Sequence, residues 1–149
     1  MKWTMFLAAA IFVGFVPTSQ ITRAADDSMT AVLTSYTKIQ QVLASDTTEG
    51  ISVAAKNILT HATSFKDKKL ANAIITGASK VAAAKDIAAA RAAFKELSKP
   101  VVSWAQKAKP AGFEVVDCSM AGAKWVQKKG TIQNPYYGKE MLECGEKVS

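Results

Sequence analysis

The sequence is poor in the side chains that most enzymes use: its 149 residues include one His and two Cys. It lacks the HExxH of zinc proteases, the GxSxG elbow of hydrolases, phosphate-binding loops, dinucleotide fingerprints and the thioredoxin-type CxxC. We therefore expect a protein that is not an enzyme.

Acidic side chains are also few, with 12 Asp and Glu against 19 Lys and Arg, so the chain carries a formal charge of +7. Its lysines stand in small groups, without the dense arginines and interleaved aromatics of a nucleic-acid groove. We expect these groups to be solvated faces and expect no nucleic-acid partner. A hydrophobic content of 49% with 21% charged residues indicates one compact domain rather than a disordered chain.

Long apolar runs are limited to the N-terminus, where residues 1–24 are typical of a signal peptide. Lys2 supplies the positive end, and residues 5–16 form an apolar run too short for a transmembrane helix. Small residues at Thr22 and Ala24 predict cleavage after Ala24. The protein is therefore expected in the periplasm, with no stable membrane span after cleavage.

Residues 25–109 carry a helical pattern, because apolar side chains recur at intervals of three and four in four successive stretches. Short polar connections favour antiparallel neighbours. We therefore expect a mainly α protein built on an antiparallel four-helix bundle. The expected inward residues are Met29, Val32, Leu33, Tyr36, Ile39 and Leu43; Ile51, Ala54, Ala55, Ile58, Ala62 and Phe65; Leu70, Ala73, Ile74, Gly77 and Val81; and Ile87, Ala90, Phe94, Leu97, Val101 and Trp104.

Polar residues stand where these helices are expected to begin. The candidate caps are residues 26–28, Asp46 with Glu49 in the spacing of a capping box, Asp67 and Asp86. Pro100 lies inside the fourth stretch, where it removes an amide donor. We therefore expect a kink or a break near Leu97.

Residues 110–149 differ in composition from the bundle. Phe113–Cys118 has the composition of a strand, and residues 134–138 form an Asn-Pro-Tyr-Tyr-Gly turn. We expect a small irregular C-terminal lobe, with a short strand and a turn, that packs on the bundle to complete one domain over residues 25–149.

The lobe also holds two pairs of sulfur side chains. Cys118 and Met120 are two residues apart and would share one side of an extended backbone, whereas Met141 and Cys144 are three apart and would be neighbours on a helical turn. If the chain folds between them, four sulfurs converge. Thiolates and thioethers select soft ions, above all Cu(I). The spacing therefore predicts a Cu(I) site with these four residues as ligands.

The same residues resemble a bacterial domain of uncharacterised function. The similar tail motif is Cys118-x-Met120, Trp125 and Ile132-x-Asn134-Pro135-Tyr136-Tyr137-Gly138-x-x-Met141-x-x-Cys144-Gly145, and the similar helical residues are Tyr36, Leu43-Ala44-x-Asp46, Ala54-Ala55 and Arg91-x-x-Phe94-x-x-Leu97-Ser98. That domain occurs alone in exported proteins and at the C-terminus of periplasmic adaptor subunits of RND heavy-metal efflux pumps of the copper/silver type. One difference is Ser119, where the family usually has Pro, which makes the first sulfur pair more flexible.

The resemblance implies a periplasmic heavy-metal-binding protein that captures or delivers Cu(I), with Ag(I) as the alternative ion, in copper/silver resistance or efflux. Its implied partner is an efflux-pump adaptor or another periplasmic protein.

Two other interpretations of the cysteines stay open. Two Cys in a small exported domain are most often a disulfide, which would contribute about 3–4 kcal/mol in the chain-entropy model. The protein would then be a disulfide-stabilised periplasmic interaction module with no metal role. The weakest alternative is a thiol-dependent redox enzyme, which needs a thiolate of lowered pKa.

Two further side chains could join a metal site. His61 offers an imidazole, although a structural histidine is the commoner case, and Trp125 could lay its ring beside a bound cation, although packing is the default for a large aromatic.

Overall fold

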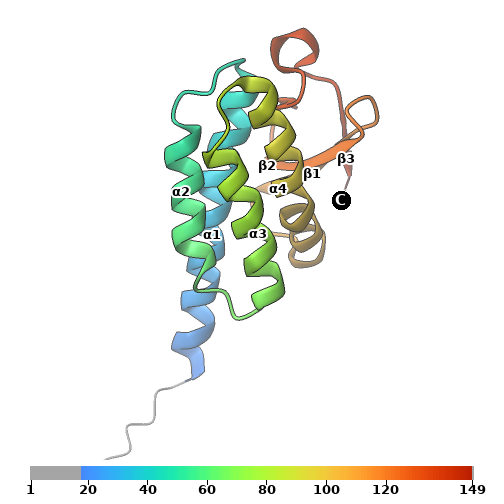
Figure 1. Cartoon of the computed structure of the whole chain (residues 1–149). Helices are drawn as coiled ribbons and strands as arrows, with labels where there is room; N and C mark the ends of the chain where they lie inside the picture. The colour runs from blue at the N-terminus through green and yellow to red at the C-terminus, as the bar shows by residue number, and fades with distance from the viewer. Residues whose placement is uncertain (1–17, 149) are drawn as a thin grey trace, which may run out of the picture.

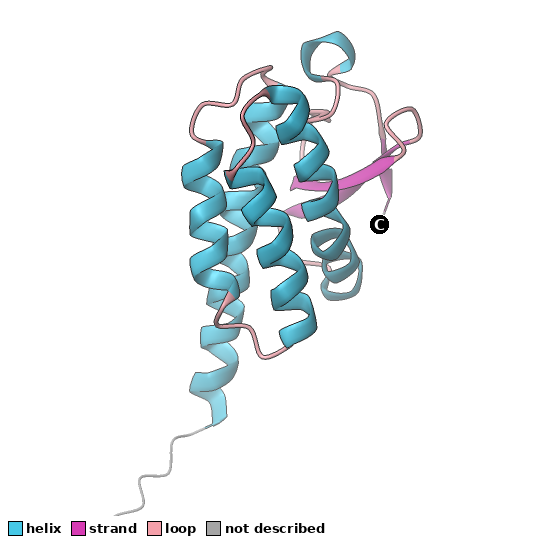
Figure 2. Cartoon of the chain, in the orientation of Figure 1, coloured by secondary structure: helices cyan, strands magenta, loops and turns pink. Residues whose placement is uncertain are grey.

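A computed structural model describes residues 18–148, with side chains from residue 27 onward. Within these residues four helices precede a small sheet (Figures 1 and 2). In chain order the elements are α1 (Thr18–Ala44), α2 (Ile51–Ala62), α3 (Lys68–Ala82), α4 (Ile87–Ala108), β1 (Phe113–Cys118), β2 (Ala123–Lys128), the 3₁₀ helix η1 (Gly138–Met141) and β3 (Glu146–Val148).

The first helix begins earlier than its expected caps at residues 26–28, because α1 already runs from Thr18. The apolar run at residues 5–16 lies outside the described residues. The signal peptide and the cut after Ala24 therefore remain predictions. None of the helices within residues 18–148 has the length and apolarity to cross a membrane.

The helices form an up-and-down bundle in which each packs against the next in sequence (Figure 1). Every inward residue expected for α1 and α2 is buried, as are most of those expected for α4. In α3 the expectation for Ala73 was wrong, since it is exposed, while Ala71 and Ala78 are buried instead. Strong 3.6-residue periodicity thus located the core well.

Two of the expected caps are present. The carboxylates of Asp67 and Asp86 accept hydrogen bonds from the backbone N–H groups of Leu70 and Ala89, at 3.0 and 2.8 Å. These bonds satisfy amides that a helix N-terminus leaves without internal partners.

The expected capping box at Asp46 and Glu49 was wrong. The residue before α2 is Gly50, in a left-handed conformation with φ 79°, and no side chain caps the helix. Asp46 itself adopts φ 59° and turns its carboxylate toward α4 and η1. The Asp46 carboxylate therefore binds Arg91 and the Lys139 amide instead of capping α2.

Of the kink or break expected near Leu97, the break does not occur, because α4 continues through Pro100 to Ala108. Buried residues on both sides of the proline, among them Ser98 and Val101, keep that face packed. The loss of one amide donor is therefore tolerated without ending the helix. Helices α3 and α4 approach closely at Gly77, where a Cβ would lie 2.7 Å from the Cα of Leu97.

The C-terminal lobe is more regular than expected. Instead of one short strand it contains a three-stranded antiparallel sheet in the order β2-β1-β3. The chain reverses after Cys118 in a turn closed by a 3.1 Å hydrogen bond from Gly122 N–H to the Ser119 carbonyl. This reversal pairs residues 123–128 with β1, which local composition did not reveal.

The sheet packs on α4 and α1, two helices that contact each other little, through β2, which touches both. Figure 1 shows the sheet beside α4. At this junction the Tyr36 hydroxyl shares a 2.6 Å hydrogen bond with Ser98 and accepts a 3.4 Å bond from Val126 N–H. The rings of Phe94 and Tyr136 extend the contact. One continuous core therefore includes the helices and the sheet.

Candidate metal-binding and thiol site

The two cysteines, distant in sequence, meet in the fold. Their Sγ atoms are 3.1 Å apart, and both are free thiols. Cys118 ends β1 and Cys144 lies between η1 and β3. The convergence of the two thiols is therefore present in the structure, although their metal-binding role remains a prediction.

The antiparallel pairing of β1 with β3 brings the cysteines together. Asp117 pairs with Glu146, which places Gly145 beside the end of β1. Gly145 has φ 152°, and a Cβ there would approach Val116 and Trp125 to 2.7 and 3.0 Å. Only glycine fits this position without displacement, so the residue after Cys144 permits its close approach to Cys118.

Asn134 holds the segment that carries Cys144. Its side chain is fully buried, and its Nδ2 donates a 2.8 Å hydrogen bond to the Cys144 carbonyl. Its Oδ1 accepts bonds from the backbone N–H groups of Tyr136 and Tyr137, at 2.8 and 3.3 Å. One side chain thus links the start of the turn to the cysteine ten residues later.

Met120 does not share a side with Cys118 as expected. The extended backbone ends at Cys118, and Met120 lies in the following turn with 64% of its surface exposed, whereas Cys118 is 1% exposed. The period-two argument failed because the turn begins one residue after the cysteine. The backbone of this turn is held by bonds from Tyr137 to the Met120 carbonyl and from Lys95 to the Ala121 carbonyl, at 3.1 and 2.7 Å.

Met141 and Cys144 do lie on one turn, because Cys144 N–H donates a 3.0 Å hydrogen bond to the Met141 carbonyl. Met141 is the last residue of η1 and is partly exposed. This is the local geometry that the spacing predicted. Within residues 18–148, no cluster of three or more His, Cys, Asp or Glu side chains is arranged to hold a metal ion.

The thiol groups differ in their electrostatic environment. Burial alone raises the pKa of Cys118. Hydrogen bonds to its thiolate outweigh this effect, so the net pKa lies below its usual value; the donors are the Cys144 thiol, the backbone N–H groups of Ala121 and Met120, and the Asn134 side chain. The pKa of Cys144 is raised because its thiol donates to Cys118, with burial and the neighbouring negative charge adding to the effect. The pair therefore favours a single thiolate at Cys118.

His61 and Trp125 lie in different surroundings. His61 is partly exposed in the last turn of α2, at the opposite end of this helix from the loop whose Asp46 contacts η1. Trp125 is fully buried, donates a 3.0 Å hydrogen bond to Gln127 and packs edge-on against Tyr136 at 5.8 Å between centroids. Packing, the default interpretation of Trp125, matches this environment.

The loop between β2 and η1 is tied to the bundle by Arg91. Its guanidinium donates to the carbonyls of Pro135 and Leu43, at 2.9 and 3.0 Å, and forms a 2.6 Å ion pair with Asp46. Asp46 also accepts a 3.0 Å bond from Lys139 N–H. The Lys139 amide and the Arg91 guanidinium hold the pKa of Asp46 below its usual value.

This contact explains Gly138, where a Cβ would collide with the Asp46 carboxylate. Gly138 also has a positive φ of 59°. The family motif quoted from the sequence contains Asp46, Arg91 and Gly138. It did not indicate that these residues contact one another.

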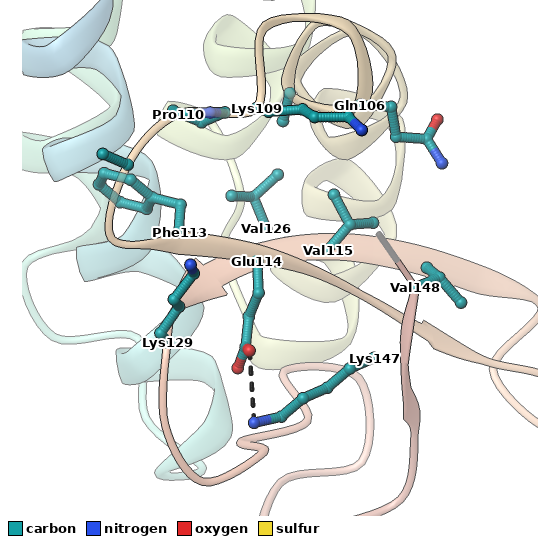
Figure 3. Close-up of a pocket in the computed structure, with 12 residues that line it drawn as sticks. Gln106, Lys109, Pro110, Phe113, Glu114, Val115, Val126, Lys129, Lys147 and Val148 are labelled. Carbon is teal, nitrogen blue, oxygen red and sulfur yellow. Dashed lines mark ion pairs between the residues drawn. The ribbon is translucent and has the colours of Figure 1, made fainter.

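A cavity of about 330 Å³ lies at the other end of β1, between the sheet and the C-terminal end of α4 (Figure 3). Phe113, Val115 and Val126 provide apolar walls, and Lys147 pairs with Glu114 at its edge, at 3.3 Å. No sulfur side chain lines it. The cavity is therefore separate from the cysteine pair.

Comparison with known proteins gives one result. A family model described as a protein of unknown function, DUF3347, matches residues 32–111, from within α1 to the residues just after α4. The sheet and both cysteines follow the matched segment. No curated protein and no solved structure matches the chain. Because the model covers more than half of its residues, the chain belongs to the DUF3347 family.

Proposed function

We propose that this protein binds a soft monovalent metal ion, Cu(I) with Ag(I) as the alternative, through the thiolates of Cys118 and Cys144. The proposal includes the exported location expected from residues 1–24 and a role in capturing or delivering metal for copper/silver resistance or efflux. The observation that carries it is the 3.1 Å approach of the two sulfurs.

The sulfur separation is compatible with a shared ion after a small adjustment. Two thiolates on one tetrahedral ion with bonds of about 2.3 Å have sulfurs about 3.7 Å apart. The pair therefore needs to open by roughly 0.6 Å for a tetrahedral ion, and by more for an ion with fewer ligands. Cys144 lies on a short irregular segment between η1 and β3, where such a displacement disturbs no helix.

The donor set favours a soft ion over zinc. A structural zinc site is usually closed by four Cys, His or carboxylate ligands, and the described residues offer the cysteines no third ligand of these types. Thioethers are the remaining soft donors nearby in sequence, at Met120 and Met141. Cu(I) accepts both thiolate and thioether ligands.

The electrostatics of the pair favour deprotonation of one of the two proposed ligands. Metal ligands must be deprotonated, so a thiol whose pKa is lowered releases its proton to the ion at less cost. Cys118 is that thiol, because its thiolate accepts hydrogen bonds from the Cys144 thiol and from backbone and side-chain N–H groups, whereas Cys144, whose pKa is raised, releases its proton at greater cost.

Anaerobic titration of the reduced protein against a Cu(I) chelator tests the proposal. The wild type is expected to remove one Cu(I) per chain from the chelator, and the Cys118→Ser, Cys144→Ser double variant to lose at least a factor of about ten in affinity, equivalent to 1.4 kcal/mol. Met120→Leu and Met141→Leu report on the thioethers, and Met29→Leu in the bundle core is the matched control. Equal affinity in the wild type and the double variant rejects the proposal.

A second function rests on the same contact. Two thiols at 3.1 Å are close enough for oxidation to a disulfide, whose S–S bond is about 2.05 Å. The protein would then be a disulfide-stabilised interaction module with no metal role. This alternative is favoured if all of the protein isolated from the periplasm carries the Cys118–Cys144 disulfide, as measured by intact mass before and after thiol alkylation.

A further inference from the structure

The two thiols differ sharply in access. Cys118 is 1% exposed at the end of β1 and belongs to the buried core, whereas Cys144 is partly exposed on an irregular segment. The turn after Cys118 is held in place by the hydrogen bonds of Lys95 and Tyr137 to its carbonyls. A reagent from solvent therefore reaches the sulfur of Cys144 before that of Cys118.

We propose that Cys144 is the site at which small-molecule disulfides modify this protein and that Cys118 is the thiol that resolves the adduct. This proposal goes beyond metal binding, because it concerns the metal-free protein and a different class of ligand. It assigns separate chemical tasks to two residues that the metal proposal uses together as ligands of one ion.

The reaction proceeds in two exchanges. The thiolate of Cys144 attacks one sulfur of oxidised glutathione, forms a mixed disulfide and releases one glutathione thiolate. The thiolate of Cys118 then attacks the Cys144 sulfur, forms the Cys118–Cys144 bond and releases the second glutathione thiolate. Two protein thiols are oxidised to one disulfide, one glutathione disulfide is reduced to two thiols, and the two protons lost by the protein pass through solvent to the two glutathiones.

Access, rather than the pKa order of the two thiols, sets this sequence of steps: the raised pKa of Cys144 lowers its thiolate fraction, but the burial of Cys118 keeps the reagent from its sulfur. Resolution needs no diffusion, because the Cys118 sulfur already lies 3.1 Å from that of Cys144. A preassembled pair of this kind gains the large effective concentration of an intramolecular step. Entry at Cys118 would instead place a bulky glutathione at a buried sulfur, which requires local opening of the fold.

Single-cysteine variants test the order. Reduced wild type, Cys118→Ser and Cys144→Ser are incubated with oxidised glutathione in the absence of metal, quenched with acid and examined by intact mass. The wild type is expected to lose two hydrogens without accumulating the adduct. Cys118→Ser is expected to retain one glutathione, and Cys144→Ser to be modified at least about a hundredfold more slowly, because its remaining thiol reacts only after local opening.

The same variants in denaturing urea provide the control. Both are expected to react at similar rates there, because unfolding removes the difference in burial. Equal rates in the native state, faster modification of Cys144→Ser, or a selectivity that persists in urea would each overturn the proposal. Since no metal is present, failure of this order leaves the Cu(I) proposal intact, and failure of the Cu(I) titration leaves the order of exchange intact.

Discussion

Replacement of Asn134 by Ala tests whether one buried amide organises the segment that carries Cys144. The substitution removes the bond to the Cys144 carbonyl at 2.8 Å and the bond from Tyr136 N–H at 2.8 Å, together with a longer one from Tyr137. A buried polar group left without its partner costs about 1–3 kcal/mol. Both bonds are only part-buried, so water can compensate in part, and we expect a loss of about 2–3 kcal/mol in the free energy of unfolding.

That loss lowers the ratio of folded to unfolded protein by a factor of about 30 to 150, since each 1.4 kcal/mol is tenfold. The measurement is urea unfolding of the reduced protein at pH 7, with Asn57→Ala on the exposed face of α2 as the matched control. The control is expected to change stability by less than about 0.5 kcal/mol, as surface substitutions usually do. If Asn134→Ala also stays within that range, Asn134 does not hold the segment as described.

Three further substitutions examine how the bundle and the lobe are joined. Arg91→Lys keeps the charge but loses the planar guanidinium that reaches the Pro135 carbonyl. It is expected to lower the free energy of unfolding by about 1–3 kcal/mol and to speed hydrogen exchange in the loop around Pro135. Unchanged exchange in this loop would argue that Arg91 does not hold it to the bundle. Gly77→Ala places a Cβ against the Leu97 backbone. The overpacking cost of about 1–3 kcal/mol is expected to exceed the gain in helix propensity, so the melting temperature falls by several degrees. A stabilised protein in calorimetry would contradict the close approach of the two helices. The pKa of Asp46 is depressed in the folded protein, so its carboxylate contributes stability at pH values above its unfolded pKa, and this contribution is lost as the pH falls through the folded pKa. In urea titrations, the greater stability of the wild type over Asp46→Asn at pH 7 is therefore expected to vanish at strongly acidic pH. A stability difference that is independent of pH would refute this origin.

The helices were predictable because their signal is local. Three or four inward residues per two turns identify an amphipathic helix without knowledge of its neighbours, and Asp67 and Asp86 act as caps within their own first turns. Asp46 was misassigned because its partner Arg91 lies 45 residues away. A local capping pattern cannot reveal such a competitor.

The sheet and the site were only partly predictable for the same reason. The strand Ala123–Lys128 is stabilised by pairing with β1 and by packing on α4, and both contacts are non-local. The spacing of the sulfur residues predicted that Cys118 and Cys144 would converge, and they do. It misplaced Met120, because the period-two argument assumed that extended backbone continues beyond Cys118, although the expected strand already ended there, as β1 does.

Because β2 packs on both α1 and α4, its position limits where this protein can be truncated. A fragment ending at Ala111, where the family match ends, would strip the sheet from Tyr36 and Phe94 and leave these buried aromatic rings facing water. We therefore expect a fragment that ends at the limit of the family match to fold poorly without the sheet. Expression of this protein as a soluble, monodisperse sample depends on carrying the strands along with the helices.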